Sequence, residues 1–347
     1  MYAQSFYPYG AFRNMFISNG RFMQLLYVKF CMHWEFNPAG SPGIHVAFAL
    51  LIQLGVVWVM WNSLQKYLKD VDAGRKLLLL IILIYMRVNV FQSDIIQYGF
   101  NVMDMYMGDM LAIIAAVLLW RYPLWKVVPL SGTLLIVAAG FTQQCIFWFA
   151  LWAVVLMYAE FWHHEEGDYK IFAAIRKNII AYLIAGIFEL FGAILKIQGS
   201  WGDISQITFS ETLKRMLETG AWLLYDCMRI QPKFINSICM GSLLILLGML
   251  TYKSGTGIKD KFKRLGVSLL LFTGIVLAIF APSIVDAWMP HRSLSSFGVL
   301  VPFLFMAILL FLGVKEMAYE KVVLTIIVIG VSFNLLVNWY WTTKIYQ

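Results

Sequence analysis

Apolar residues along the chain are gathered into ten runs separated by shorter polar links. The runs lie at about 43–62, 77–90, 100–120, 127–140, 144–160, 178–197, 233–252, 265–281, 297–314 and 321–340. Most of them approach the length of about 20 residues that a helix needs to cross about 30 Å of hydrocarbon. We expect helices, because an open strand would leave unpaired backbone groups in lipid. The pattern therefore predicts an all-α fold, a polytopic bundle of about ten transmembrane helices.

One part of the pattern departs from simple crossings. The stretch 127–162 is too long for one crossing and barely long enough for two. A more polar break at Gly140–Gln144 divides it. We therefore expect short or re-entrant helices on the two sides of this break.

The composition agrees with a membrane protein. Of the 347 residues, 61% are hydrophobic and 13% are charged, against about 45–50% and about 25% in soluble proteins. We interpret residues 1–347 as a single membrane-embedded domain. The net charge of +8 does not indicate a nucleic-acid partner, because the lysines and arginines are spread over short links and form no single basic face.

The distribution of basic residues predicts the topology. Alternate links are rich in lysine and arginine, namely 63–76, 121–126, 161–177, 253–264 and 315–321. These links should face the cytoplasm, where Lys and Arg concentrate in membrane proteins. The remaining connections would then lie on the other side: 1–42, 91–99, 140–144, 198–232 and 282–296.

Two of the outer connections are too long to be turns. Residues 1–42 and the large outer loop 198–232 are rich in aromatic and charged residues, which is typical of interfacial helices lying on the outer face. Residues 1–42 contain no signal-peptide core ahead of the first crossing. We therefore expect the natural gene to encode a further helix upstream of Met1, and a stop codon just before Met1 in the genomic frame would refute this expectation.

Ionisable residues inside the apolar runs are candidates for chemistry, because burying them in a membrane is costly. Asp104 and Asp109 lie in the run 100–120, about 140° apart around a helix. Glu189 lies near the middle of the run 178–197, and Arg87 ends the run 77–90, where it could extend to the interface. The structural alternative for the acidic residues is a capping, ion-pairing or hydrogen-bonding role inside the bundle.

Further polar residues fall in the outer connections: Arg13, Asn19, Arg21, Asp94, Gln143, Gln144, His291 and Arg292. The planar guanidinium of arginine suits phosphate oxygens, and a nearby carboxylate can take a proton from an attacking hydroxyl. These residues outline a pocket at the outer interface for a phosphorylated lipid and a polar acceptor. Alternatively, the arginines anchor phospholipid head groups and the glutamines satisfy backbone groups at the helix break.

Other familiar sites are not indicated. The cluster His163-His164-Glu165-Glu166 is expected to be a solvated loop, because consecutive residues do not share a helix face. The four cysteines have no CxxC spacing and are interpreted as packing residues. The chain has no GxxxxGK[ST], GxGxxG, GxSxG or HExxH, the motifs of soluble nucleotide-binding proteins, hydrolases and zinc proteases.

Four short elements recur in an order that resembles a known family. They are Asn19-Gly20-Arg21-Phe22, the segment Val90–Leu119, Gly140-Phe141-Thr142-Gln143-Gln144, and Pro290-His291-Arg292 ahead of Phe297-Gly298. In these elements the chain resembles the polytopic glucosyltransferases that decorate O-antigen, the glucosyltransferase II or serotype-conversion family. The resemblance covers roughly residues 10–315.

The resemblance implies a GT-C-like glycosyltransferase of the bacterial inner membrane with its active site facing outward. Such an enzyme takes a sugar, here expected to be glucose, from a polyprenyl-phosphate donor and places it on a polysaccharide acceptor. It needs no organic cofactor and is either independent of metal or assisted by a divalent cation. Arg21, His291 and Arg292 would bind the donor phosphate, and Arg13, Asn19, Gln143 and Gln144 would line the acceptor site.

The catalytic acid is the point at which the chain departs from the family. The family carries an acidic pair upstream of the Asn-Gly-Arg element, whereas Tyr2–Tyr9 contains no Asp or Glu. Either that acid lies upstream of Met1, or Asp94 replaces it, with Asp104 as the second catalytic candidate. The rival functions are a polysaccharide polymerase, a flippase or transporter of lipid-linked sugars, and an assembly subunit without catalysis.

Overall fold

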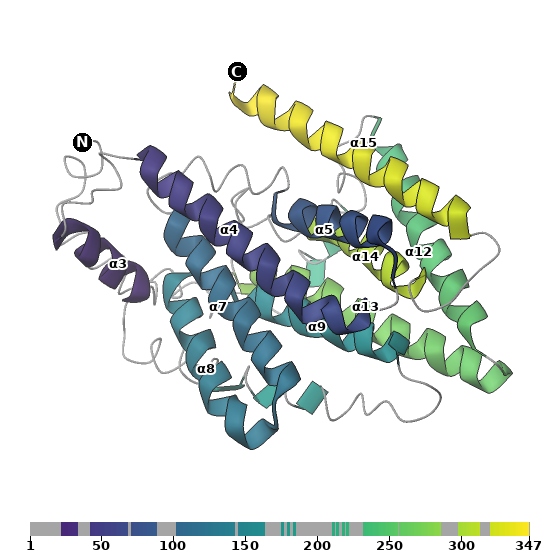
Figure 1. Ribbon diagram of the computed structural model, residues 1–347, viewed down its shortest axis with the longest axis horizontal. Coiled ribbons are helices and arrows are strands. Elements are labelled where there is room, and N and C mark those ends of the chain that lie inside the picture. The colour runs from purple at the N-terminus through teal and green to yellow at the C-terminus, as the bar shows by residue number, and fades with distance from the viewer. Residues whose placement is uncertain are drawn as a thin grey trace. The chain divides into compact units, whose positions relative to one another are not determined.

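A computed structural model describes residues 22–33, 42–68, 71–88, 102–142, 145–163, 232–255, 257–285, 298–312 and 320–346, with short pieces of 175–184 and 210–221. Within these ranges the regular structure is helical (Figure 1). The elements are α3 (Phe22–His33), α4 (Pro42–Leu64), the 3₁₀ turn η1 (Gln65–Tyr67), α5 (Ala73–Arg87), α7 (Val102–Arg121), α8 (Leu124–Phe141), α9 (Cys145–His163), α12 (Phe234–Ser254), α13 (Ile258–Val285), α14 (Leu300–Leu312) and α15 (Glu320–Tyr346).

The helices coincide with the hydropathy pattern. Nine of the ten predicted runs fall on α4, α5, α7, α8, α9, α12, α13, α14 and α15. The tenth run, 178–197, lies outside the described residues except for two short pieces. The predicted break also occurs: α8 ends at Phe141, Thr142 has extended backbone angles (φ −159°, ψ 137°), and α9 begins at Cys145.

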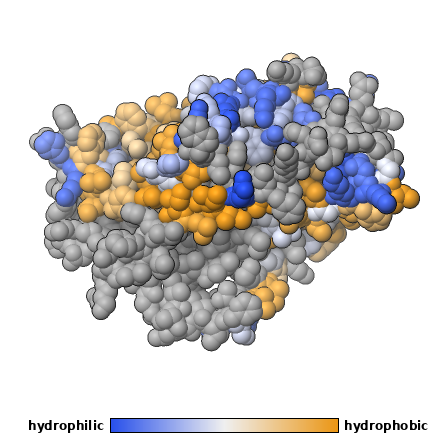
Figure 2. Space-filling model, turned by 90° about the horizontal axis from the view of Figure 1, so that it is seen from below, coloured by the Kyte–Doolittle hydropathy of each residue, from blue (hydrophilic) through white to orange (hydrophobic). Residues whose placement is uncertain are grey.

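Five of the described helices are long and apolar enough to cross a membrane: Gly43–Tyr67, Val102–Arg121, Cys145–His163, Phe234–Lys253 and Glu320–Val337. Many large apolar side chains on these helices are exposed, including Trp58 at 65% and Leu336 at 62%. Figure 2 shows hydrophobic residues of this kind at the surface. Exposed apolar surface of this extent indicates contact with lipid, so the chain has the character of a membrane protein.

The chain divides into two compact units. Unit 1 comprises residues 1–59, 95–153 and 170–209, and unit 2 comprises residues 60–94, 154–169 and 210–347. Two residues join α7 to α8, so these helices form a hairpin within unit 1. The hydroxyl of Ser131 in α8 donates to the carbonyl of Ala115 in α7 at 3.1 Å, and both side chains are buried.

In unit 2, α5 is fixed to α15 at two points. Arg75 pairs with Glu320 near the start of both helices. Tyr85 donates to Asn334 at 3.2 Å, in buried surroundings.

Arg87, at the end of α5, is 1% exposed. The expectation that Arg87 could extend to the interface is therefore wrong, because its side chain is buried within the protein.

Candidate functional site

One buried polar cluster in unit 1 is the candidate functional site, and it begins on one face of α3. Gln24, Tyr27 and Cys31 are spaced three and four residues apart, so they line the same side of the helix. Gln24 is 1% exposed and Cys31 is fully buried. The Oε1 atom of Gln24 is buried and has no hydrogen-bond partner among the described residues.

Tyr27 connects α3 with the first turns of two other helices. Its phenol oxygen lies 2.6 Å from Nδ1 of His45 in α4 and 3.5 Å from the sulfur of Met103 in α7. The rings of Tyr27 and His45 meet edge to face. His45 is fully buried. A buried imidazole in contact with a phenol is a suitable relay for a proton.

Asp104 supplies the negative charge of the cluster. It lies in the first turn of α7 and is fully buried. Its Oδ1 accepts a hydrogen bond from the backbone N–H of Met105 at 2.9 Å. The amino end of a helix dipole favours a carboxylate at this position. A small hydrophobic cluster of Ala49, Val102 and Tyr106 packs α4 against the same part of α7.

Two pKa shifts show that these groups influence one another. Burial raises the pKa of the Tyr27 phenol, and the neighbouring Cys31 and the charge of Asp104 raise it further. Burial also raises the pKa of the Cys31 thiol, an effect that the hydrogen bond from Tyr27 opposes and the charge of Asp104 reinforces. At neutral pH both groups are therefore uncharged, and Tyr27 acts as a hydrogen-bond donor rather than as a base.

Glycines allow the helix ends around the cluster to approach closely. A Cβ atom on Gly140, near the end of α8, would lie 2.5 Å from the ring of Phe22 and 2.9 Å from Cγ of Met23 at the start of α3. A Cβ atom on Gly108 in α7 would collide with the sulfur of Cys145 at the start of α9. The start of α3, the first turns of α4 and α7, and the α8–α9 break are thus neighbours in unit 1.

Replacing Gly140 by alanine is expected to lower any activity of this site while the chain stays folded. The added methyl group must displace Phe22 and Met23, and therefore the α3 face that carries Gln24 and Tyr27. The measurement is the activity of membranes that contain equal amounts of each chain. Gly43→Ala is the matched control, because in the part of the chain that the structure describes nothing lies within 4 Å of a Cβ there. Equal activity of the two variants would show that the position of α3 does not matter.

Of the residues predicted from the sequence to form the site, the structure describes Asp104. The others lie outside the described residues: Arg13, Asn19, Arg21, Asp94, Gln143, Gln144, His291 and Arg292. Their roles remain predictions. Arg21 and Gln143 are each next in sequence to a described residue, Phe22 and Thr142 respectively. Phe22 in turn packs against Gly140.

The sequence pattern did not mark Gln24 and Tyr27 of α3, or His45 of α4, as site residues. His45 was detectable, because it is an ionisable residue inside the apolar run 43–62, and the same criterion selected Asp104. Gln53 in the same run is also buried, at 5%. Gln24 and Tyr27 gave no comparable signal, since polar and aromatic residues are ordinary in an interfacial helix.

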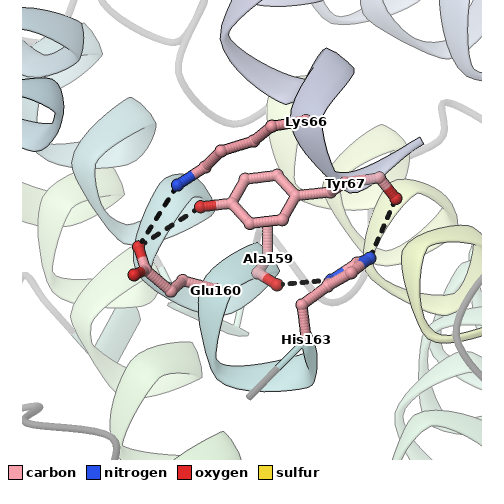
Figure 3. Close-up of polar contacts among 5 residues, drawn as sticks. All are labelled: Lys66, Tyr67, Ala159, Glu160 and His163. Atoms are coloured by element: carbon pink, nitrogen blue, oxygen red, sulfur yellow. Dashed lines mark hydrogen bonds and ion pairs between the residues drawn. The ribbon is translucent and has the colours of Figure 1, made fainter. Parts of the chain in front are cut away.

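A second polar cluster lies in unit 2, where α4 and α9 end (Figure 3). The carboxylate of Glu160 accepts a hydrogen bond from the Tyr67 hydroxyl at 3.3 Å and lies 3.7 Å from Nζ of Lys66. The two ring nitrogens of His163 are each 2.8 Å from a backbone carbonyl oxygen, of Ala159 and of Tyr67. Carbonyls only accept, so both contacts are hydrogen bonds when both nitrogens carry a proton.

This arrangement corrects the prediction for His163. We expected a solvated loop, but His163 is the last residue of α9 and is half-buried against Tyr67. The remainder of that cluster, His164, Glu165 and Glu166, lies outside the described residues. The contacts of His163 hold the end of α9 against the turn η1, which follows α4. The role of His163 is therefore structural.

Replacing His163 by alanine is expected to destabilise the chain by about 1–3 kcal/mol, because the contacts of its ring with the carbonyls of Ala159 and Tyr67 are lost. Thermal unfolding of the purified protein in detergent should show a lower midpoint. Lys66→Gln is the control, since the Lys66 side chain is 52% exposed and an ion pair of that kind contributes about 0–1 kcal/mol. If both variants unfold at the same temperature, the His163 contacts do not hold the helices together.

Comparison with known proteins adds no relative: no family model, no curated protein and no solved structure matches the chain. Among the described residues, no group of three or more His, Cys, Asp and Glu side chains is placed to hold a metal ion. The features of the chain that bear on function are therefore the geometry around Asp104 and the sequence elements next to it.

Proposed function

We propose that this chain is a membrane glycosyltransferase that moves a sugar, glucose in the first instance, from a polyprenyl-phosphate donor to a cell-surface polysaccharide such as O-antigen. It would act on the outer face of a bacterial inner membrane. The observation that supports this proposal is the meeting of several helix ends around a buried carboxylate. Asp104, Tyr27 and His45 come from three helices and lie within one unit.

The sequence elements that resemble the glucosyltransferase family provide the second support. Phe22 belongs to the first element, Asp104 to the second and Gly140 to the third. Phe22 packs against Gly140, and Gly108 of the second element lies against Phe141 of the third. Elements that are far apart in the sequence are therefore neighbours in unit 1, as residues of one site must be. The fourth element, which contains His291 and Arg292, lies outside the described residues.

The proposed reaction is a displacement at the anomeric carbon of the donor sugar. An acceptor hydroxyl forms the new carbon–oxygen bond, the bond to the donor phosphate breaks, and polyprenyl phosphate leaves. A carboxylate, Asp104 or Asp94, takes the hydroxyl proton. Arg21, His291 and Arg292 would hold the phosphate as its negative charge develops. Arg13, Asn19, Gln143 and Gln144 would bind the acceptor, together with Gln24, whose Oε1 has no partner among the described residues.

The positions of Asp104 and His45 favour a transferase over a flippase or transporter. A transport route needs polar groups near the middle of the bilayer. Asp104 and His45 instead lie in the first turns of α7 and α4, at the ends of helices that are long enough to cross the membrane. The charge pattern predicts that these two ends face the outside.

The lipid-linked sugars of a strain that lacks the gene distinguish the enzyme classes. Thin-layer analysis should show accumulation of a polyprenyl-phosphate monosaccharide, with cell-surface polymer of normal length that lacks the side sugar. Accumulation of lipid-linked oligosaccharide repeats, with loss of long polymer, would identify a polymerase and refute the proposal. Unchanged lipid-linked sugars and an unchanged polymer would instead favour a structural subunit.

A further inference from the structure

The hairpin between α12 and α13 in unit 2 has an unusual concentration of positive charge. Between Lys253 and Arg264 there are five basic residues and one acidic residue. The acidic residue, Asp260, accepts a hydrogen bond from Arg264 at 3.0 Å, and this pair lies within one helix. The hairpin therefore takes its net positive charge from its four lysines, Lys253, Lys259, Lys261 and Lys263.

Large apolar side chains are exposed among these lysines. Ile258 is 71% exposed, Phe262 is 62% exposed and Tyr252 is 40% exposed. The rings of Tyr252 and Phe262 meet edge to face with centroids 6.2 Å apart. Figure 2 shows hydrophilic and hydrophobic residues side by side at the right-hand end, where this hairpin lies in Figure 1. The hairpin thus combines cations with an apolar surface.

Local contacts hold the hairpin in shape. The backbone N–H of Lys261 donates to the carbonyl of Gly257 at 2.9 Å. Gly255 approaches so closely that a Cβ atom on it would lie 2.7 Å from the backbone nitrogen of Lys261. The ammonium group of Lys261 lies 5.2 Å from the centre of the Tyr252 ring. The cations and the aromatic side chains are therefore presented together where α12 ends and α13 begins.

We propose that the α12–α13 hairpin is a docking surface for anionic phospholipid, with Ile258 and Phe262 among the lipid chains and the lysine ammonium groups on the phosphates. Anionic lipids of the cytoplasmic leaflet attract basic residues beside a membrane helix. Long lysine side chains can reach the head groups while their stems cover apolar surface. A nucleic acid or an acidic peptide would match the lysines but would leave Ile258 and Phe262 facing water. This inference does not depend on glycosyl transfer.

A fluorescent reporter on the hairpin tests the proposal in the full chain. Gly257 is exposed, and a Cβ there would meet no described atom within 4 Å, so Gly257→Cys can carry an environment-sensitive dye. The four native cysteines are replaced by alanine, and the protein is placed in bilayers of phosphatidylcholine. Replacing part of that lipid by phosphatidylglycerol should shift the emission to the blue, with saturation.

Variants and controls make the outcome specific. Changing Lys259, Lys261 and Lys263 to Gln should raise the half-saturating fraction of phosphatidylglycerol by at least about five-fold, since each single lysine near an anionic surface contributes about that factor in affinity. Changing the same three lysines to Arg should leave the fraction unchanged. The control variant changes Lys66, Lys126 and Lys321 to Gln, which removes the same charge from other links and should have no effect.

Three results would overturn the proposal. The first is a reporter that does not respond to phosphatidylglycerol. The second is a Gln variant that folds, by circular dichroism, and responds like the unmodified hairpin. The third is the same blue shift with inorganic phosphate in pure phosphatidylcholine, because this would assign the lysines to a small phosphate ligand instead of a lipid surface.

Discussion

Asp104→Asn is expected to reduce sugar transfer by at least about a hundred-fold, which is the usual contribution of a general base. Asparagine keeps the size of the side chain and can still accept the hydrogen bond from Met105. It cannot take the proton of an acceptor hydroxyl. The measurement is the transfer of radiolabelled sugar from polyprenyl phosphate to the polysaccharide in isolated membranes, normalised to the amount of inserted chain.

The matched control is Asp109→Asn. Asp109 lies on the same helix, is 6% exposed, and points about 140° away from Asp104. Transfer by this variant should remain near that of the unmodified chain. Normal transfer by Asp104→Asn would remove Asp104 from the mechanism. An equal loss in both variants would mean that the two carboxylates serve the helix bundle rather than the reaction.

Gly108→Ala is expected to destabilise the chain by about 1–3 kcal/mol, because the added methyl group overpacks a closed interface. A Cβ atom there would collide with the Cys145 sulfur and would lie 3.2 Å from both the Ala138 carbonyl oxygen and Cβ of Phe141. The atoms of the α8 backbone cannot move without shifting the helix. The measurement is the midpoint of thermal unfolding of the purified protein in detergent.

Gly248→Ala in α12 provides the control, because no atom of the described residues lies within 4 Å of a Cβ atom at that position. It should unfold at the same temperature as the unmodified chain or slightly higher, since alanine favours a helix over glycine. If Gly108→Ala were as stable as Gly248→Ala, the close approach of α7 to the α8–α9 break would be contradicted. The candidate site would then lose the packing that positions Asp104.

The positions of the helices were predictable because a membrane-crossing helix must be apolar around its whole circumference. The run 43–62 became α4, and the polar break at Gly140–Gln144 became the α8–α9 junction. Helix ends were less predictable. The run 265–281 corresponds to α13, which begins at Ile258 and ends at Val285. Its first turn is rich in lysine, so hydropathy alone places it in a loop.

The site was predictable only in part, because burial and pairing depend on contacts between distant segments. The sequence indicated Asp104, because a charged side chain inside an apolar helix costs free energy in a membrane. It could not show that Tyr27 on α3 meets His45 on α4, or that Arg87 is buried. His163 was misjudged for the same reason, since its partner is the carbonyl of Tyr67, 96 residues away.

The most direct test of the central claim is the side of the membrane on which each link lies. Single cysteines at Lys259 and Ser295, in a chain without other cysteines, are treated in intact cells with a maleimide that does not cross the membrane. The account predicts labelling at Ser295, in the connection 282–296, and protection at Lys259 until the cells are opened. Labelling at Lys259 with protection at Ser295 would contradict both the outward-facing site and the cytoplasmic hairpin.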